Sequence, residues 1–306
     1  MGENVGLVIK GINNIYTVVN SKYLPKIDNT VVCRIKGKVL SDIEDSYNPL
    51  AVGDWVKYSD ELLIYQRLER KNSFERYNLK SKSNQTLVAN MDLVLIVGSK
   101  DKPPFRPRFI DRAIVCSHDN EIMILLNKGD LELDDMMRER FDLYKELGYN
   151  TKIVSAFNEH EIQELKEELK GLKVALIGQS GVGKSTIINA LLGSQEVQKI
   201  GNISHKYQRG RHTTRFSVML DAKEFLLVDT PGMRELHIPT TEIINIASSF
   251  PEFRKVADEC TFSGCLHIHE PGCAVKRDLE MNLINEDRYF SYLRMVEALE
   301  ERPTRY

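Results

Sequence analysis

Residues 178–185, GQSGVGKS, constrain the fold of this chain more than any other part of its sequence. They fit the pattern G-x-x-x-x-G-K-[ST], in which glycines let a loop curl so that backbone N–H groups face the phosphates of a nucleotide. An apolar stretch at residues 173–177 precedes the loop, and a helical pattern at residues 186–192 follows it. A chance glycine-rich turn would require neither. The sequence therefore predicts a phosphate-binding loop at a helix N-terminus, where the helix dipole favours anions.

Two side chains of this loop have predicted chemical roles. Lys184 is expected to reach the β- and γ-phosphates, and the Ser185 hydroxyl is expected to ligate Mg²⁺. Backbone groups would hold the remaining phosphate oxygens. The predicted nucleotide contacts in this stretch are Gly178, Gln179, Ser180, Gly181, Val182, Gly183, Lys184, Ser185 and Thr186.

The segment before the loop alternates between strand-like and helix-like patterns. Such alternation is typical of parallel βαβ units with helices on both faces of the sheet. We therefore expect an α/β core, with a polar connecting segment at residues 71–92 before it. The expected strands are residues 92–98, 121–127 and 152–156, and the expected helices are residues 108–117, 132–148 and 159–170.

The second of these strands ends in NKGD, residues 127–130, which matches the guanine-recognition pattern N-K-x-D. The Asp130 carboxylate can accept hydrogen bonds from N1–H and the exocyclic amine of guanine, whereas adenine has no N1–H. Asn127 would contact the other edge of the base, and the stem of Lys128 would cover its face. The alternative is a plain turn in which Asp130 caps the following helix.

Ligands of open α/β sheets bind at the carboxyl ends of the strands. Residues 127–130 follow one such strand, and Ser155 and Ala156 end the next. The two loops should therefore lie together, and we predict that Ser155 and Ala156 form a second contact with the base.

Downstream of the phosphate loop, residues 208–215 are polar and lack periodicity. We expect a loop here that closes on Mg²⁺ and the γ-phosphate as an ordering switch. Thr214, just before the next strand, is favoured as the magnesium ligand, with Thr213 as the rival.

Two strands at residues 216–220 and 224–228 are expected to form a hairpin that leads into DTPG, residues 229–232. Asp229 could support the Mg²⁺ shell, and the Gly232 N–H could reach the γ-phosphate. This tetrapeptide is a simple turn in many proteins, but its place one strand after a phosphate loop favours the nucleotide role.

The first seventy residues have the pattern of a small β-barrel. Short β-prone runs are separated by glycine, asparagine and aspartate turns. About five strands in this length suit a barrel of the oligonucleotide-binding type. The runs are residues 5–9, 15–19, 30–40, 54–58 and 62–68.

The net charge of −2 means that any nucleic-acid surface must be local. Arg34, Lys36 and Lys38 alternate, so a strand would place all three on one face, as a groove that follows a nucleic-acid backbone requires. An ordinary solvated strand is the alternative, because basic and acidic residues tie at nine each in residues 1–70.

Near the C-terminus, three cysteines and a histidine fall within fourteen residues. Three thiolates and one imidazole form a tetrahedral structural zinc set with no open position for catalysis. The total of five cysteines is odd, which argues against a disulfide framework. Free buried cysteines are the alternative, and His269 is a spare candidate ligand. The predicted zinc ligands are Cys260, Cys265, His267 and Cys273.

The order of these signatures is permuted, because N-K-x-D precedes the phosphate loop whereas it follows D-x-x-G in ordinary Ras-like GTPases. The chain resembles the circularly permuted GTPases, and specifically the small-subunit ribosome biogenesis GTPase family known as RsgA or YjeQ, over nearly its whole length. The strings GRHTT at residues 210–214 and EPGCAV at residues 270–275 are close to family strings.

The resemblance implies three domains: an OB-fold barrel at residues 1–70, a circularly permuted GTPase domain at residues 71–239, and a helical zinc-binding domain at residues 240–306. It favours His267 over His269 as the zinc ligand. One departure is Gly129, where the family usually carries isoleucine. We expect this position to face away from the base contacts.

The resemblance also implies GTP hydrolysis to GDP with Mg²⁺, and one structural Zn²⁺ per chain. Lys184, Thr214 and His212 would be the catalytic residues. Met233 stands where Ras-like enzymes carry the glutamine that orients water, and a thioether cannot do so. His212 would replace it, since an imidazole can orient water or accept its proton. Contact between His212 and a partner is the alternative.

The implied partners are the small (30S) ribosomal subunit and its rRNA, with subunit-stimulated hydrolysis, no DNA and no membrane. A cytoplasmic protein is expected, because no apolar run reaches the length of a membrane span. The chain is also expected to be a monomer. A nucleic-acid binder with a purely structural nucleotide site is disfavoured by the intact Ser185, Thr214 and Asp229. A GTP-dependent metabolic enzyme is disfavoured because no further acid–base constellation is visible.

Overall fold

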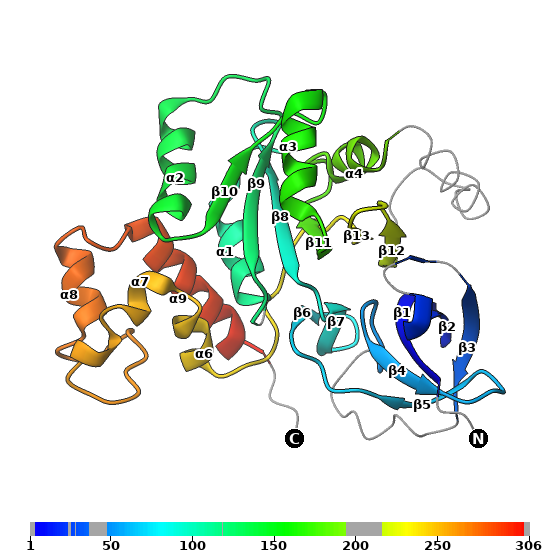
Figure 1. The fold of residues 1–306 in the computed structure, drawn as a ribbon. Coiled ribbons are helices and arrows are strands. Elements are labelled where there is room, and N and C mark those ends of the chain that lie inside the picture. The colour runs from blue at the N-terminus through cyan, green and yellow to red at the C-terminus, as the bar shows by residue number, and fades with distance from the viewer. Residues whose placement is uncertain are drawn as a thin grey trace.

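The structure is a computed structural model that describes residues 4–23, 26–27, 29–36, 48–117, 119–193 and 216–302. Figure 1 shows a small β-barrel on one side of a central sheet with its helices, and a helical part on the other side. The multidomain α/β class is therefore confirmed. The domain boundaries after residues 70 and 239 stay a prediction.

Five strands form the barrel: β1 (Asn4–Ile12), β2 (Ile15–Asn20), β3 (Thr30–Ile35), β4 (Trp55–Tyr58) and β5 (Leu63–Arg67), with the 3-10 turn η1 (Ser21–Tyr23) after β2. They pair in the order β1-β2-β3-β5-β4, and a β1–β4 pairing closes the barrel. This is the expected five-stranded closed sheet. Arg34 and Lys36 are exposed as the alternation predicts, whereas Lys38 lies outside the described residues.

The predicted connecting segment at residues 71–92 is wrong, because it contains a β-hairpin of β6 (Ser73–Asn78) and β7 (Ser83–Ala89). Phe74 and Val88 are fully buried in the main core. The register of the hairpin shifts between Phe74 and Glu75. Such a bulge breaks the two-residue period by which a strand is recognised in a sequence.

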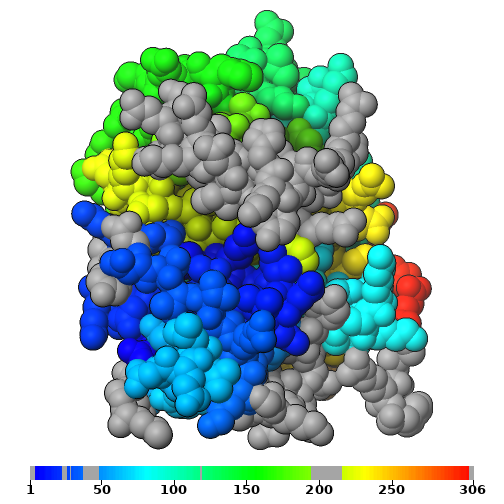
Figure 2. All heavy atoms as spheres, turned by 90° about the vertical axis from the view of Figure 1, so that its right-hand side faces the viewer, coloured from blue at the N-terminus to red at the C-terminus, as the bar shows by residue number. Residues whose placement is uncertain are grey.

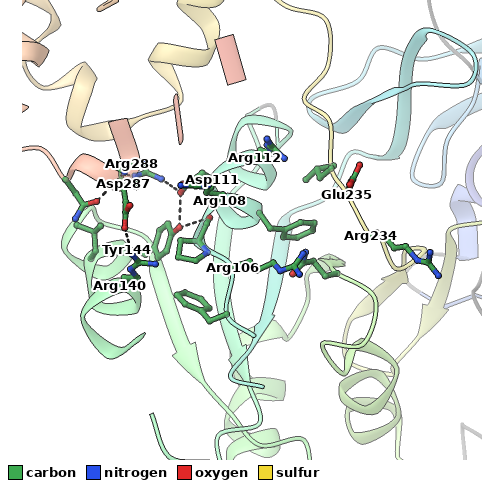
Figure 3. A pocket seen from close by; sticks show the side chains of 17 residues that line it. Arg106, Arg108, Asp111, Arg112, Arg140, Tyr144, Arg234, Glu235, Asp287 and Arg288 are labelled. Atoms are coloured by element: carbon green, nitrogen blue, oxygen red, sulfur yellow. Dashed lines mark hydrogen bonds and ion pairs between the residues drawn. The ribbon is translucent and has the colours of Figure 1, made fainter. Parts of the chain in front are cut away.

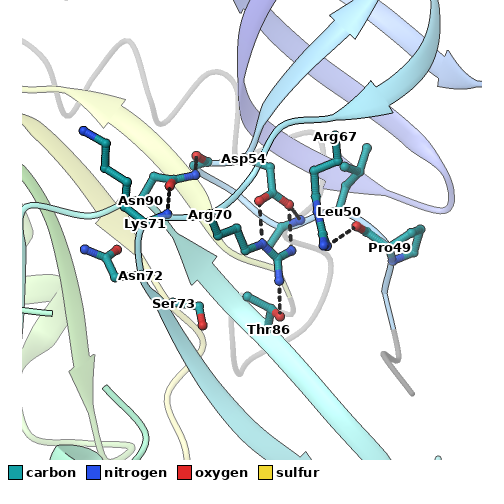
Figure 4. A network of polar contacts seen from close by, with 12 residues as sticks. Pro49, Leu50, Asp54, Arg67, Arg70, Lys71, Asn72, Ser73, Thr86 and Asn90 are labelled. Atoms are coloured by element: carbon teal, nitrogen blue, oxygen red, sulfur yellow. Dashed lines mark hydrogen bonds and ion pairs between the residues drawn. The ribbon is translucent and has the colours of Figure 1, made fainter. Parts of the chain in front are cut away.

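A buried ion pair joins the barrel to this hairpin (Figure 4). Arg70 donates from two nitrogens to the two carboxylate oxygens of Asp54, at 2.7 and 2.8 Å, and from its third nitrogen to Thr86 Oγ1 at 2.8 Å. Next to it, a Cβ on Gly53 would lie 1.8 Å from the Ala89 carbonyl oxygen. Only glycine permits this approach, so the barrel is closely fitted to the hairpin.

The central sheet contains β8 (Leu93–Ser99), β9 (Ile122–Asn127), β10 (Asn150–Ile153), β11 (Lys173–Gly178), β12 (Val218–Asp221) and β13 (Leu226–Asp229). Its order is β10-β9-β8-β11-β13-β12. All neighbours are parallel except the β12–β13 hairpin, as predicted. The edge strand β12 also pairs with β1 of the barrel, where Lys10 faces Val218, so the two sheets are continuous. In Figure 2 the barrel, in blue, accordingly lies against the yellow segment that contains β12.

Helices cover both faces of this sheet: α1 (Pro107–Val115), α2 (Asp135–Glu146), α3 (Glu159–Leu169) and α4 (Lys184–Leu192). Successive residues of a strand point to opposite faces. Accordingly, Leu95 and Val97 of β8 pack in the cluster beneath α3 and α4. Val94 and Ile96 pack in the cluster beneath α1 and α2.

The C-terminal part contains α6 (Ile243–Ser248), α7 (Pro251–Arg254), η2 (Ala257–Glu259), α8 (Ala274–Glu280) and α9 (Glu286–Glu300). Tyr292 and Val296 of α9 are buried in the same cluster as α1, so the predicted apolar stripe is core. Arg288 is buried and pairs with Asp111 of α1 and Glu252 of α7. None of the helices in the described part of the chain is long and apolar enough to span a bilayer.

Candidate nucleotide site and metal centre

The phosphate loop runs from the end of β11 to the start of α4, as the sequence predicts. Gly181 and Gly183 have φ values of 88° and 94°, a backbone region that side chains disfavour. A Cβ on Gly183 would also lie 2.2 Å from the Asn127 side-chain nitrogen. These two glycines are therefore required by the shape of the loop and by its contact with the loop after β9.

Lys184 folds back over the phosphate loop. Its Nζ donates to the carbonyl oxygens of Gly178 at 2.7 Å and Gln179 at 3.2 Å, and the residue is only 7% exposed. Burial lowers the pKa of Lys184 to about 8, although the nearby Asp229 acts in the opposite direction. Lys184 forms no ion pair among the described residues. A buried cation held only by carbonyls fits a site made for the phosphates of a nucleotide.

The DTPG segment lies directly against this loop. Ser180 N donates to Met233 O at 3.0 Å, and a Cβ on Gly232 would lie 3.4 Å from Lys184 Nζ. Gly232 is thus close to where Lys184 would meet the phosphates. Met233 is 2% exposed and belongs to the hydrophobic core. Its side chain therefore cannot orient a water molecule at the phosphates.

The base-recognition loop is joined to the phosphate loop through Asn127. Its Nδ2 donates to Val182 O at 2.9 Å. Its Oδ1 is buried and has no hydrogen-bond partner within the described ranges. A buried acceptor without a donor is costly, so this atom fits a site that a ligand completes.

Asp130 and Ser155 meet as the strand order predicts. Ser155 Oγ donates to Asp130 Oδ1 at 2.8 Å, and this bond lowers the pKa of Asp130. The carboxylate is therefore held ionised at the place where a guanine amine and N1–H would donate. Ala156 follows directly at the same edge of the sheet. The Ser155 N–H donates to a carboxylate oxygen of Glu161 at 2.6 Å, a contact that sequence patterns did not reveal.

Lys100 is a second residue that the sequence analysis missed. It follows β8, it is 7% exposed, and its Nζ donates to Gly129 O at 3.0 Å and to Leu131 O. These carbonyls flank Asp130, so Lys100 fixes the backbone on both sides of the carboxylate that is predicted to recognise guanine. Burial lowers the pKa of Lys100, and the charge of Asp130 acts against that effect. Its position at the end of a buried strand was the available signal.

Gly129 lies against the second base loop. A Cβ at this position would be 2.8 Å from the Val154 carbonyl carbon and 3.0 Å from Ser155 N. Gly129 N donates to Val154 O at 2.9 Å. We expected this residue to face away from the base contacts, and this is wrong, because Gly129 lies against Ser155. Gly129 thereby sets the distance between the loop of Asp130 and the loop of Ser155.

The predicted magnesium ligands fall in different parts of the structure. Ser185 is exposed in the first turn of α4, with Thr186 half-buried beside it. Asp229 ends β13 near Lys184. Thr213, Thr214 and His212 lie outside the described residues. The Ser185 hydroxyl suits Mg²⁺, which prefers oxygen ligands, and Asp229 would offer a carboxylate oxygen from the end of β13.

The four predicted zinc ligands form one cluster. The ligand atoms of Cys260, Cys265, His267 and Cys273 all lie within 4.8 Å of one another. His267 Nδ1 is 3.7 Å from Cys260 Sγ and 3.4 Å from Cys273 Sγ. Usual zinc–ligand bond lengths in a tetrahedron place sulfur and nitrogen about 3.6 Å apart. The cluster therefore has the size of a zinc site. The spare candidate His269 is exposed and is not part of it.

The cluster is supported by its own loop. The Glu270 carboxylate accepts from the N–H groups of Leu266, Ile268 and His269, and Tyr289 donates from its hydroxyl to His267 O. Burial raises the pKa of Cys265 to about 12. Such a thiol becomes a thiolate only when a cation compensates its charge, which fits a bound metal.

Comparisons with known proteins agree with this geometry. The family model described as RsgA GTPase matches residues 67–239. The small ribosomal subunit biogenesis GTPase RsgA of Borreliella burgdorferi strain B31 is 39% identical over 300 residues, which cover 95% of each chain. The corresponding protein of Flavobacterium johnsoniae is 37% identical, covering 97% of this chain and 94% of its own.

Two solved structures are similar over almost the whole chain. The crystal structure of YjeQ from Thermotoga maritima aligns with a TM-score of 0.70 and 30% identity, covering 99% of this chain and all of that one. The structure of YloQ, described as a circularly permuted GTPase, aligns with a TM-score of 0.68 and 23% identity, covering 100% and 98%. The fold, including the permuted order of its loops, is shared.

Proposed function

The chain belongs to the RsgA GTPase family, and on that premise we propose that it is a GTP-driven switch that acts in biogenesis of the small ribosomal subunit. It would bind the subunit and its rRNA, and the subunit would stimulate its hydrolysis of GTP. The observation that carries the proposal is the hydrogen bonding of the Asn127 side chain. It joins the guanine loop to the phosphate loop and keeps a buried oxygen for a ligand.

The nucleotide would be held by the residues that the sequence singles out. Asp130, Ser155 and Ala156 would bind the base, and Lys184 and the loop amides would bind the phosphates. Ser185 and Thr214 would hold Mg²⁺, which supplies positive charge against the phosphate oxygens when it is bound. Hydrolysis then depends on positioning and charge stabilisation rather than on covalent chemistry.

His212 is the proposed water-orienting residue, because Met233 is buried in the core. His212→Ala should remove the subunit-stimulated part of turnover and leave GTP affinity within about three-fold. Single-turnover hydrolysis with and without 30S subunits, together with GTP titration, tests this role. A large loss of GTP binding in the variant would instead assign His212 to the nucleotide site itself.

The layout supports a switch with two partner-binding ends. The barrel and the zinc-bearing part lie on opposite sides of the core (Figure 1). The barrel is joined to the core through β12, which precedes the β13 strand that ends in Asp229. A nucleotide can shift the equilibrium between two conformations only when it binds one of them more tightly than the other. The GTP-bound form should therefore bind small subunits more tightly than the GDP-bound form.

Sedimentation with purified 30S and 50S particles tests this proposal. Binding should be tighter with a non-hydrolysable GTP analogue than with GDP, it should weaken as salt rises, and 50S particles should compete poorly. Equal binding in both nucleotide states, or preference for the large subunit, would leave only the GTPase activity standing.

A further inference from the structure

A cavity of about 470 Å³ lies between the GTPase core and the C-terminal part (Figure 3). Its walls are the start of α1, one side of α2, the start of α9 and the segment after DTPG. Gln179 of the phosphate loop also lines it. The cavity is therefore adjacent to the nucleotide site but does not include the predicted base or phosphate contacts other than Gln179.

Positive charge dominates the walls of this cavity. Six arginines and three carboxylates line it, although the whole chain carries a net charge of −2. The lining carboxylates are Asp111, Glu235 and Asp287, and the lining arginines are Arg106, Arg108, Arg112, Arg140, Arg234 and Arg288.

Two of the arginines are neutralised and four are not. Arg288 pairs with Asp111 and Arg140 pairs with Asp287 (Figure 3), and Arg288 also pairs with Glu252 behind the cavity wall. In the described part of the chain, the other four make no ion pair or side-chain hydrogen bond. The remaining carboxylate, Glu235, contacts His237 instead, with Oε2 and Nε2 3.5 Å apart. The unneutralised arginines are Arg106, Arg108, Arg112 and Arg234.

The start of α1 adds to this positive potential. Arg106 is its N-cap residue and makes no side-chain capping bond, and Pro107 occupies the first turn. The positive end of the helix dipole therefore meets the same cavity as the free guanidinium groups. A cavity with this excess of arginine is complementary to phosphate, which guanidinium binds through paired N–H donors.

We propose that this cavity binds backbone phosphate of single-stranded RNA. The proposal rests on the proposed function, because it names where the RNA partner would touch this chain. The arginines are spread around the walls in Figure 3 and do not converge on one point, which suits successive phosphates of a strand better than one small anion. Phe105 also lines this cavity, so an aromatic ring lies in the same wall as the arginines.

The position of the cavity links this RNA contact to the nucleotide. Gln179 belongs to the phosphate loop, and Arg234 comes two residues after Gly232. RNA in the cavity would therefore contact both segments that meet the phosphates of GTP. A contact of this kind can make RNA affinity depend on the nucleotide state.

The test uses Arg106→Gln with Arg108→Gln, since both side chains are exposed and have no ion-pair partners in the described structure. Arg294→Gln is the matched control, because Arg294 is an exposed, unpaired arginine on α9 outside the cavity and within the described part of the chain. Binding of a labelled 12-nucleotide single-stranded RNA to the full chain is measured by anisotropy at several KCl concentrations, with saturating GDP in the phosphate loop.

The double variant should bind this RNA about ten-fold more weakly, and its salt slope should fall by about 0.7 for each phosphate that the protein no longer neutralises. The control should change affinity by less than about two-fold, and GTP affinity and basal turnover should be unchanged in all variants. Equally weakened RNA binding in variant and control, or unchanged RNA affinity, would overturn the proposal.

A second arm separates RNA from a small phosphate ligand. Inorganic pyrophosphate is titrated against the RNA complex at constant ionic strength, again with saturating GDP. If the double substitution removes pyrophosphate binding but leaves RNA binding intact, the cavity takes a small anion and the RNA assignment is wrong. Wild-type protein that binds neither RNA nor 30S subunits would count against the proposed function, whereas wild-type binding with no effect of the variants would count against the cavity alone.

Discussion

The nucleotide site and the metal cluster of this chain are built in opposite ways. The four ligands of the cluster come from one stretch, residues 260–273. The nucleotide site is assembled from loops that follow β8, β9, β10, β11 and β13, so its residues span positions 100–232. The first site is nearly complete within a single loop, whereas the second exists only when the sheet has formed.

The two sites also differ in what holds them together. In the nucleotide site, protein groups bind one another: Lys100, Asn127 and Lys184 each donate to backbone carbonyls. In the metal cluster, three thiols and an imidazole face one another at ligand distance. Burial raises the pKa of Cys265 and Cys273 and lowers the pKa of His267, so it disfavours the charged form of these three groups. We infer that the metal matters mainly for folding, whereas the nucleotide matters mainly for function.

The largest expected effect comes from breaking the metal cluster with Cys265→Ser. Structural zinc contributes on the order of 10 kcal/mol to the folding of small zinc modules. The variant, or the wild type with a strong chelator, should lose the cooperative unfolding of residues 240–302 and keep GTP affinity within a few-fold. Metal analysis of the wild type should give about one zinc per chain. If protein prepared without chelator contained no zinc, the assignment of this cluster as a zinc site would be wrong.

The converse change is Lys184→Met in the phosphate loop. GTP affinity should fall by at least about 100-fold, since methionine cannot donate a charge-assisted hydrogen bond to phosphate. Stability without nucleotide should not fall, because the variant removes a buried cation that forms no ion pair in the described structure and whose burial outweighs the attraction of Asp229. Nucleotide titration and urea unfolding measure the two effects. A variant that unfolds would show that Lys184 is also structural.

Lys100→Met tests whether the nucleotide site depends on contacts between its loops. Removing the bonds to Gly129 O and Leu131 O should free the backbone beside Asp130 and weaken GTP binding by about 30-fold. Lys100→Arg should restore part of the affinity. The ratio of GTP to ITP affinity is the decisive readout, because ITP lacks the exocyclic amine. An unchanged ratio would make Lys100 a general stabiliser only.

The smallest expected effect is a pH dependence without nucleotide. The pKa of Lys184 is lowered from its ordinary 10.5 to about 8 in the folded chain. Between these values the unfolded chain binds more protons, so this group makes stability rise with pH, by about 1 kcal/mol per pH unit. From pH 8 to 10, the urea concentration at the midpoint of unfolding should rise more steeply with pH in the wild type than in Lys184→Met. Equal slopes in the two proteins would contradict the lowered pKa of Lys184.

The comparison of the two sites also explains which of them could be predicted. Spacing alone predicted the metal cluster but left His269 as a spare ligand, and the family resemblance favoured His267. In the structure the ligand atoms of Cys260, Cys265, His267 and Cys273 lie together. The phosphate loop and NKGD were equally visible, because each is a short string on one strand end. Lys100 and Glu161 could not be recognised in the sequence, since neither belongs to a known motif and both act through backbone groups of other loops.

By itself, the sequence determined the elements that depend on local periodicity and fixed spacing: the five barrel strands, the βαβ core, the two ligand loops and the metal cluster. Tertiary structure decided how these elements meet. The β1–β12 pairing, the hairpin at residues 73–89 and the arginine-lined cavity each bring together residues far apart in the chain. Neighbouring residues set periodicity, but such long-range contacts depend on the path of the whole backbone and on side-chain packing.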